Sequence, residues 1–378
     1  MKILHIAPVY NNNTQGISRS VVNLCEAQSE LGHSVCLASS KPFKYQKSKK
    51  MKLFNLFDES FFSLLFGYSI NKIKKEIGIP DVIIFHDIYN LKQYLILLNL
   101  IYYRYHIFLT PRGAFSKVAL SRNYFLKKIY NIFIIKPILP FINGFIALNP
   151  NEKKIIENHT QKKTIIMSNG TKDNTKLYRL NKKNYELKMK RKEIEICFVG
   201  RFDIYIKGLD LLISSYLKYL KNDCKNIINI TLIGDHIEKK EFSSKEYISK
   251  AITSMKDKAK IRIIGPLFGD DLISEITKMD ILIQPSRTEG MPNSVLEAMS
   301  LGIPCCVTPQ TNVADIIKEA GCGWEIDCSV DGILNFFREI NKIDKKNISI
   351  MGQNGMDYAN KYLTWHKVSR PDYFKNEL

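Results

Sequence analysis

Short apolar runs alternate with amphipathic stretches along most of the 378-residue chain. Runs rich in Ile, Val or Phe are typical of buried parallel strands, and the stretches between them suit helices that cover both faces of a sheet. The alternation therefore predicts an α/β fold built on parallel sheets. The expected strands are 2–9, 34–39, 81–86, 106–110, 144–148, 163–167, 195–199, 227–234, 260–265, 281–284 and 304–308, and the expected helices include 18–31, 209–219, 270–279, 294–301 and one that begins at 149–152.

The alternation is interrupted once, in a polar stretch rich in Lys and Asn around residues 171–191. A chain of this length suits two domains, at ~100–200 residues per domain. We expect a first domain over residues 1–175, a linker over 176–189 and a second domain over 190–355. The aromatic tail, residues 356–378, is expected to form a helix that packs back on the first domain.

The formal net charge of +19 is concentrated in the first half of the chain. Residues 1–192 contain 32 Lys and Arg against 11 Asp and Glu, whereas residues 193–378 contain 24 against 26. Only the first half therefore favours an anionic partner. A non-enzymatic nucleic-acid-binding protein stays a remote alternative, because no helix-turn-helix, zinc-finger or aromatic RNA-binding pattern accompanies the charge.

Neither the cysteines nor the apolar runs indicate a metal site or a membrane span. The eight cysteines form no Cys-x-x-Cys pair, which favours buried free thiols in a reducing compartment. The first nine residues are expected to be a buried strand and not a signal peptide. The longest apolar stretch, 129–148, is interrupted by Lys136, Pro137 and Pro140, so we expect no transmembrane segment.

The strongest functional pattern follows the expected strand 281–284. A turn containing Glu289 and Gly290 leads into a helix that opens near residues 292–294. The free N–H groups of the first helical turn suit a phosphate, and Gly290 permits a close approach to a ligand. Glu289 and Glu297 would flank that anion and accept hydrogen bonds from sugar hydroxyls. Taken alone, the two carboxylates are more typical of a Glu in a solvated loop and a Glu that interacts favourably with a helix N-terminus.

A second pattern, Gly-Arg-Phe-Asp followed by Lys-Gly-Leu-Asp, comes after the expected strand 195–199. Arg201 follows the carboxyl end of that strand, where ligands of open α/β sheets bind, and Lys207 precedes the next helix. Two cations beside a helix N-terminus would hold a diphosphate. Surface cations are the alternative for each residue by itself.

Together these motifs resemble the retaining glycosyltransferases of family 4, of the type that builds bacterial surface polysaccharides. The resemblance implies the GT-B fold, with two facing Rossmann-like domains. It also implies that Arg201 and Lys207 hold the donor diphosphate, that Glu297 contacts the ribose, and that Glu289 contacts the transferred sugar. The implied catalytic residues are Arg201, Lys207 and Glu289, and the implied donor-binding residues are Gly16, Arg201, Lys207, Glu289, Gly290, Met291, Pro292, Asn293, Ser294, Val295 and Glu297.

The first domain departs from the family pattern in two places. The loop after the first strand has Gln-Gly at 15–16 where relatives have Gly-Gly, and Gly16 keeps the close backbone approach. Many relatives have a His before the Gly at the segment that reads Thr-Pro-Arg-Gly at 110–113 here, which resembles an Arg-Gly variant within the family. No catalytic His is therefore assigned to that position. Arg112 and His86 are the expected residues on the acceptor side.

The resemblance implies transfer of a hexose-type sugar, with retention, from a nucleoside-diphosphate sugar to a glycan or lipid-linked acceptor of O-antigen, capsule or exopolysaccharide synthesis. No Asp-x-Asp motif is present, so we expect neither a metal ion nor another cofactor. A sugar-nucleotide epimerase of the same fold is the alternative. A phosphorylase would need a pyridoxal-phosphate lysine that nothing in the sequence marks.

Two segments of the first domain interleave cations with aromatic and aliphatic residues, over 41–66 and 122–133. Such segments suit an anionic bilayer surface, although a solvated charge run over an ordinary core has the same composition. We expect a cytoplasmic enzyme held peripherally at the inner face of the cytoplasmic membrane.

Overall fold

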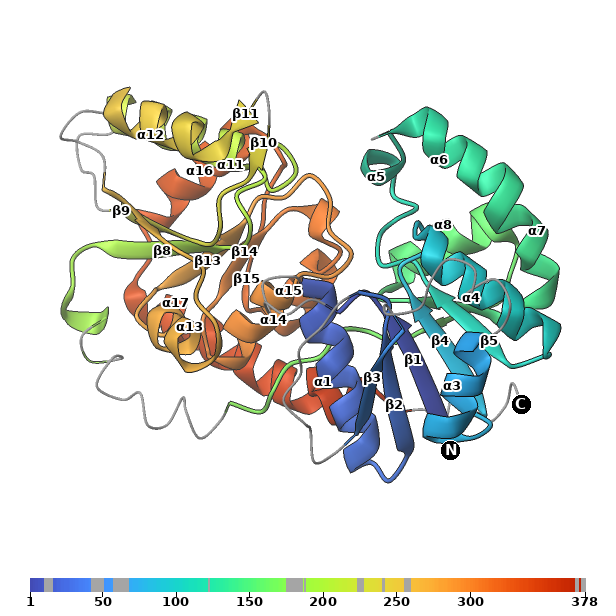
Figure 1. Cartoon of the computed structure of the whole chain (residues 1–378). Helices are drawn as coiled ribbons and strands as arrows, with labels where there is room; N and C mark the ends of the chain where they lie inside the picture. The colour runs from blue at the N-terminus through green and yellow to red at the C-terminus, as the bar shows by residue number, and fades with distance from the viewer. Residues whose placement is uncertain are drawn as a thin grey trace. The chain divides into compact units, whose positions relative to one another are not determined.

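The chain folds into two compact units, and it returns to the first unit after completing the second. The computed structural model describes residues 1–9, 16–41, 51–56, 68–121, 123–174, 186, 188–222, 228–239, 242–254, 260–370 and 374. Unit 1 comprises Met1–Gly170 and the C-terminal segment from Trp365, and unit 2 comprises Thr171–Thr364. Each unit contains one parallel sheet covered by helices (Figure 1).

Unit 1 contains a seven-stranded sheet in the order β3-β2-β1-β4-β5-β6-β7, and every neighbouring pair is parallel. From β1 the chain adds β2 and β3 toward one edge of the sheet and then β4 to β7 toward the other, so the strand order reverses between β1 and β4. Doubly wound sheets bind ligands at such a point. The strands are β1 (Lys2–Ala7), β2 (Ser34–Ser39), β3 (Lys52–Asn55), β4 (Val82–His86), β5 (Ile107–Thr110), β6 (Gly144–Ala147) and β7 (Thr164–Ile166).

Alternate residues of these strands pack on opposite faces of the unit 1 sheet, as the period of two requires. In β1, Leu4 and Ile6 belong to one core cluster and Ile3 to another. The first cluster includes residues of α3, α4, η1 and α8, and the second includes α1, Trp365 and Phe374. The helices are α1 (Gly16–Glu30), α3 (Tyr68–Ile77), α4 (Leu91–Tyr102), α5 (Lys117–Ser121), α6 (Tyr124–Tyr130), the π-helix η1 (Asn131–Ile135), α7 (Lys136–Ile138), η2 (Leu139–Phe141), α8 (Pro150–Thr160) and α18 (Trp365–Val368).

Unit 2 contains a six-stranded parallel sheet in the order β12-β9-β8-β13-β14-β15 and a small hairpin of β10 and β11. The strand order of this sheet reverses between β8 and β13, and the two motif segments singled out in the sequence follow these two strands. The strands are β8 (Ile194–Val199), β9 (Ile228–Ile233), β10 (Glu238–Lys239), β11 (Phe242–Ser243), β12 (Ile261–Ile264), β13 (Ile281–Gln284), β14 (Cys305–Val307) and β15 (Gly323–Glu325).

Helices cover both faces of the unit 2 sheet (Figure 1). Helices α11 and α16 share one cluster with β8, β9 and β13, in which Tyr216, Tyr219 and Phe337 pack ring against ring. The helices are α11 (Leu209–Asn222), α12 (Ser244–Ser254), α13 (Gly269–Ile276), α14 (Asn293–Ser300), η4 (Pro309–Thr311), α15 (Ala314–Ala320), α16 (Val330–Ile340), α17 (Lys345–Tyr358) and η5 (Ala359–Leu363).

The structure confirms the α/β class and, within a few residues, every strand expected from the sequence. It moves the domain boundaries. The first unit ends at Gly170 and not at 175, and the tail joins unit 1 at Trp365 and not at 356. The earlier boundary fails because Gly355 and Met356 are buried in unit 2, where a Cβ on Gly355 would touch Cys322. Most of the expected linker, 175–185 and 187, lies outside the described residues.

Three further observations concern the cysteines, the side chains that could bind a metal ion, and the apolar helices of the described residues. Its seven cysteines are unpaired, and all are buried except the half-buried Cys328; Cys224 lies outside it. The described His, Cys, Asp and Glu side chains form no group of three that could hold a metal ion. Among the described helices, none has the length and apolarity needed to cross a membrane.

Candidate functional site

The carboxylate of Glu289 is the centre of a polar cluster in unit 2. Its Oε1 accepts hydrogen bonds from Lys207, from Gln284 Nε2 at 3.2 Å and from Ser286 Oγ at 3.0 Å. Gln284 and Ser286 are fully buried, and the side chains of Lys207 and Glu289 retain only 18% and 14% of their exposure. A charge-assisted contact in such a partly dry site is stronger than one on an open surface.

Two loops form this cluster at the carboxyl ends of β8 and β13, where the sheet direction reverses. They meet at Gly208, whose φ of +67° and missing Cβ are both required: a Cβ there would lie 2.0 Å from the carbonyl oxygen of Pro285. A second tie is Arg287, which donates to both carboxylate oxygens of Asp210 at 2.7 Å. These hydrogen bonds raise the pKa of Arg287, so its guanidinium stays charged in the ion pair with Asp210.

Hydrogen bonds to its backbone hold the turn that carries Glu289. The Nδ2 of Asn312 donates to the carbonyl oxygen of Glu289 at 2.6 Å, and the N–H of Glu289 donates to the carbonyl oxygen of Gln310 at 3.0 Å. Thr308 Oγ1 donates to the carbonyl oxygen of Ser286 at 2.6 Å. The turn is therefore held in place before any ligand binds, as a binding site requires.

The helix α14 begins immediately after this turn, with Pro292 as its N-cap in an extended conformation. Met291, Pro292 and Val295 are buried, so their side chains serve the core and only their backbone can serve a ligand. Asn293, Ser294 and Glu297 are half-buried on the same helix. The first-turn N–H groups of α14 supply a partial positive charge close to Glu289 in sequence.

Of the cations expected from the sequence, Lys207 lies at the cluster and Arg201 does not contact it. Arg201 is exposed, and its guanidinium forms neither a hydrogen bond nor an ion pair with the described residues, although its carbonyl oxygen accepts from the N–H of Asp203 at 2.8 Å. A pocket of about 440 Å³ is lined by the residues that follow Arg201 in the chain, and its volume falls in the size range of small-molecule sites. It is lined by Phe202, Asp203, Ile204, Tyr205, Asp210, Ile237 and Tyr247.

Unit 1 brings the two expected acceptor-side residues together at the carboxyl ends of β4 and β5. Arg112 donates to His86 Nδ1 from Nε at 3.3 Å and lies 3.2 Å from it at Nη2. Its Nη1 donates to Asn169 Oδ1 at 3.3 Å. Arg112 is half-buried, with a φ of +52°, whereas His86 is only 1% exposed. His86 therefore lies beneath Arg112 and reaches a ligand only through it.

The loop that carries Arg112 is held by the buried carboxylate of Glu152. Glu152 accepts hydrogen bonds from the N–H of Gly113 and, at 2.7 Å, from the N–H of Leu148. Burial nevertheless raises the pKa of this carboxyl group. Gly16 begins α1, and its carbonyl oxygen accepts from Ser20 Oγ at 2.8 Å; residues 10–15 before it lie outside the described residues.

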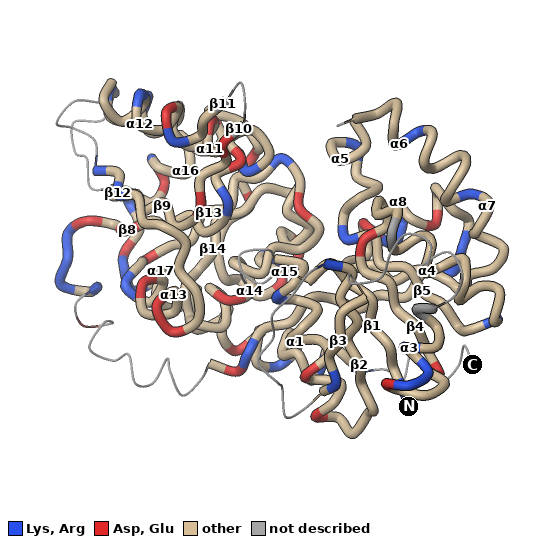
Figure 2. Tube along the Cα trace, viewed as in Figure 1, with Lys and Arg blue, Asp and Glu red and all other residues tan. Residues whose placement is uncertain are grey.

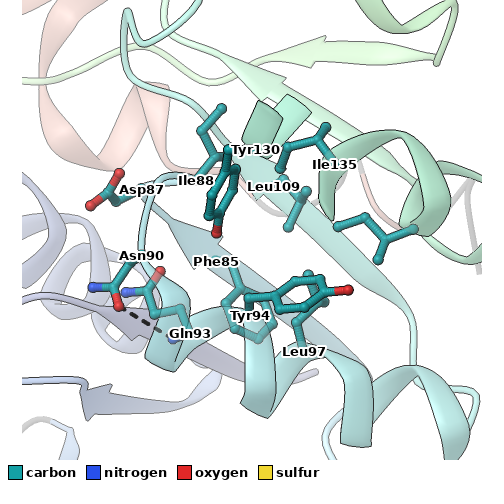
Figure 3. Close-up of a pocket in the computed structure, with 11 residues that line it drawn as sticks. Phe85, Asp87, Ile88, Asn90, Gln93, Tyr94, Leu97, Leu109, Tyr130 and Ile135 are labelled. Carbon is teal, nitrogen blue, oxygen red and sulfur yellow. Dashed lines mark hydrogen bonds between the residues drawn. The ribbon is translucent and has the colours of Figure 1, made fainter. Parts of the chain in front are cut away.

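Unit 1 also contains a small pocket between the carboxyl ends of β4 and β5 and the helices α4 and η1 (Figure 3). Asp87, Asn90 and Gln93 line one side of it, and Tyr94, Tyr130 and Leu109 line another. Its free volume of about 20 Å³ holds roughly one water molecule, so it is not a sugar site as it stands.

Several residues of the two clusters were not assigned to a site from the sequence. In unit 2 these are Gln284, Ser286 and Asn312, and in unit 1 His5, Gln28, Glu152 and Asn169. The available signal was a polar residue inside or at the end of an apolar strand, as in His5 within β1 and Gln284 at the end of β13. Buried polar groups need partners, so such residues mark hydrogen-bonded clusters.

Both buried histidines should make folding depend on pH. Burial lowers the pKa of His5 to about 4, and burial together with Arg112 lowers that of His86 well below 6.5. Between about pH 6.5 and 4 the unfolded chain therefore binds more protons than the folded one, and stability falls as the pH falls. For the two rings together we expect the free energy of unfolding to change by up to about 3 kcal/mol per pH unit.

Thermal unfolding between pH 7.5 and 5 tests this. The slope should be smaller in the double variant His5→Gln/His86→Gln than in the wild type, and unchanged in His106→Gln, whose ring bonds Asn143 near the surface. Equal slopes in all three proteins would contradict the expectation.

Comparison with known proteins agrees with the fold and yields a family match over most of unit 2. Residues 193–343 match the family model described as glycosyl transferases group 1. Over 103 residues the chain is 29% identical to a UDP-Gal:alpha-D-GlcNAc-diphosphoundecaprenol alpha-1,3-galactosyltransferase of Escherichia coli. That match spans 27% of this chain and about a quarter, 26%, of the relative.

Two solved structures align with nearly the whole chain. One is the sucrose-phosphate synthase of Thermosynechococcus elongatus, with a TM-score of 0.75, 15% identity and coverage of 98% and 96% of the two chains. The other is Anabaena HepE in complex with UDP-glucose, with a TM-score of 0.73, 14% identity and full coverage of both chains. The chain has the GT-B fold, as expected from the sequence, and its resemblance to GT-B glycosyltransferases is confirmed.

Proposed function

Starting from a GT-B chain whose residues 193–343 match the group 1 glycosyl transferases, we propose that the protein is a retaining hexosyltransferase. It takes a hexose-type sugar from a nucleoside-diphosphate sugar and transfers it to a glycan or a lipid-linked acceptor. The observation that carries this is the Lys207–Glu289 cluster at the point where the unit 2 sheet reverses, beside the N-terminus of α14.

The residues divide the work by charge. Lys207, Arg201 and the first-turn N–H groups of α14 stabilise the negative charge that builds on the departing diphosphate. Glu289 accepts hydrogen bonds from hydroxyls of the transferred sugar, and Glu297 from the ribose. The reaction proceeds by substitution on one face of the sugar, with the departing diphosphate taking the proton of the acceptor hydroxyl. We propose that it needs neither a metal ion nor another cofactor.

Support for a lipid-linked acceptor comes from the E. coli relative, whose name specifies a diphosphoundecaprenol-linked substrate. We propose that the present protein acts in synthesis of O-antigen, capsule or exopolysaccharide, at the inner face of the cytoplasmic membrane. An epimerase of the same fold is the second candidate, and only an acceptor-dependent product separates it from a transferase.

The test is product analysis with a panel of UDP- and GDP-sugars, with and without total lipid-linked glycan as acceptor. We expect one donor to give acceptor-dependent release of the nucleoside diphosphate and an α-linked product from an α-linked donor. Interconversion of the nucleotide sugar without an acceptor would instead identify an epimerase, and a product of inverted configuration would refute retention.

An exposed apolar face on unit 1 supports the membrane proposal. Helix α6 and the π-helix η1 expose Phe125, Leu126 and Phe133 by 71%, 67% and 70%. Lys128 on α6 and Lys136 on α7 are exposed, and Figure 2 shows cations along both helices. Apolar side chains beside cations suit an anionic bilayer, to which each Lys adds about 1 kcal/mol. Most of the other segment expected to bind membranes, 41–66, lies outside the described residues.

We expect the protein to sediment with vesicles rich in anionic lipid at low salt, and to be released as salt screens the attraction. Phe125→Ser/Phe133→Ser should reduce binding several-fold. The matched control is Ile350→Ser, which removes an apolar side chain that is 59% exposed in unit 2. Equal binding by the double variant and the control, or no vesicle binding by the wild type, would contradict the proposal.

A further inference from the structure

A continuous chain of hydrogen bonds extends from Arg112 through the unit 1 sheet to the C-terminal segment. His86 Nε2, on β4, lies 2.9 Å from His5 Nδ1, on β1, and the two rings stack at 5.2 Å. His5 Nε2 lies 2.8 Å from Gln28 Oε1, on α1. Gln28 Nε2 then donates to the carbonyl oxygen of Ser369 at 3.3 Å. We refer to Gln28, His5 and His86 as the relay.

The two ends of the relay determine where its protons lie. A guanidinium can only donate, so His86 Nδ1 must accept from Arg112, which leaves the proton of a neutral ring on Nε2. That Nε2–H donates to His5 Nδ1, so the proton of His5 also lies on Nε2 and is donated to Gln28 Oε1. At the other end, a backbone carbonyl can only accept from Gln28. Every hydrogen bond of the relay is satisfied when both rings are neutral. A second proton on either ring would place two donors opposite each other.

The guanidinium of Arg112 donates hydrogen bonds to two side chains, and neither of them is an anion. His86 and Asn169 accept its hydrogen bonds as neutral groups. The nearby carboxylate of Glu152 is occupied by the N–H groups of Gly113 and Leu148, and the other titratable neighbours are the Cys25 thiol and His5. The pKa of Arg112, about 10 after burial, still leaves it charged at neutral pH. Arg112 is thus oriented without being neutralised by a bonded carboxylate.

We propose that Gln28 and His5 are positioning residues that act through His86 to aim Arg112, in its charged form, at a phosphate group of a substrate. This inference rests on the proposed function for the identity of the substrate. The planar fork of a guanidinium matches a phosphate in two parallel hydrogen bonds, and its value depends on a fixed orientation. The phosphate belongs either to the nucleotide sugar or to the acceptor.

The first experiment reads the relay directly and needs no activity. In protein labelled with ¹⁵N-histidine, the His5 and His86 signals, assigned with His5→Asn and His86→Asn, should both report a neutral ring protonated at Nε2 from pH 8 to pH 5.5. Inorganic pyrophosphate should shift the His86 Nδ1 signal in the wild type and not in Arg112→Met. A charged ring, a proton on Nδ1 of either residue, or no shift with pyrophosphate would overturn the proposal.

The second experiment separates positioning from packing with two substitutions at one site. The Oδ1 of Asn occupies nearly the place of Nδ1 in His86, so His86→Asn keeps an acceptor for Arg112. His86→Gln keeps a group near Nε2 and removes that acceptor. We expect His86→Gln to raise the KM of the phosphate-bearing substrate by ~10–100-fold more than His86→Asn does, the range for a hydrogen bond to a charged group. The substrate whose KM rises, donor or acceptor, identifies the source of the phosphate.

Gln28→Glu extends the test to the far end of the relay. A carboxylate at this position favours a protonated His5, which reverses the direction of the relay and removes the acceptor beneath Arg112. The same KM should therefore rise as the pH falls from 8 to 6 in Gln28→Glu and stay level in the wild type. Equal KM values for His86→Asn and His86→Gln, or no pH dependence in Gln28→Glu, would reduce the relay to core packing. Absence of transfer with every donor would refute the proposed function, and the NMR result would still decide the relay.

Discussion

Lys207→Ala is expected to lower turnover by ~10²–10³-fold, the range for removing one group that stabilises charge in a transition state. In the free protein Lys207 forms an ion pair with Glu289, and both side chains are largely withdrawn from solvent. A bound diphosphate brings two further anionic groups to the same place, so the lysine can stabilise charge on the leaving group without moving far. Arg201→Ala should act in the same direction, because Arg201 is exposed and available to the same ligand.

The measurement is steady-state turnover at saturating donor, with the folded state verified by thermal unfolding. Lys218→Ala is the matched control: it removes a lysine of the same unit that is 53% exposed and forms an ion pair with Asp331. Turnover within a few-fold of the wild type in Lys207→Ala, or an equal loss in the control, would contradict the assigned role.

Glu289→Gln is expected to impair transfer by ~10²-fold while leaving nucleotide binding nearly intact. The reason is the geometry of its carboxylate, whose Oε1 already accepts from Lys207, Gln284 and Ser286. A glutamine in that place presents either a weaker acceptor or an NH₂ group opposed to three donors. The side chain would rotate, and the contact with the transferred sugar would be lost in the transition state.

Glu297→Gln should show the opposite behaviour, with weaker nucleotide binding and a smaller effect on transfer, because Glu297 lies about one helical turn past the start of α14, whereas Glu289 lies in the turn before that helix. Calorimetric titration of both variants with the free nucleoside diphosphate, beside turnover of the nucleotide sugar, distinguishes the two roles. An equal loss of nucleotide affinity in Glu289→Gln and Glu297→Gln would refute the division.

The strands could be predicted because each buried parallel strand is a short apolar run that local sequence alone reveals. The strands β3 and β15 were missed for a physical reason: their segments, Lys-Leu-Phe-Asn and Gly-Trp-Glu, are short and carry charges, as edge strands do. The place where the chain returns to unit 1 could not be predicted, since it depends on which unit buries Met356 and Trp365.

The site could be predicted only where a motif lies on one loop. Arg201, Lys207 and Glu289 lie on loops that follow strands, and a motif names them directly. The partners that orient them come from elsewhere in the fold, as with Asn312 beneath Glu289 or His5 beneath Arg112 through His86. Such partnerships depend on strand order, which places β1 beside β4 and β8 beside β13, and strand order is not written in local sequence.

The central claim is that the Lys207–Glu289 cluster binds a nucleoside diphosphate. Calorimetric titration of the full-length protein with UDP, GDP, ADP and dTDP, without added divalent ions, tests it most directly. We predict saturable binding of at least one of them at a single site, weakened ~10-fold or more in Lys207→Ala and unchanged in Lys218→Ala. Failure of all four nucleotides to bind, or equal affinity in the wild type and Lys207→Ala, would contradict the account.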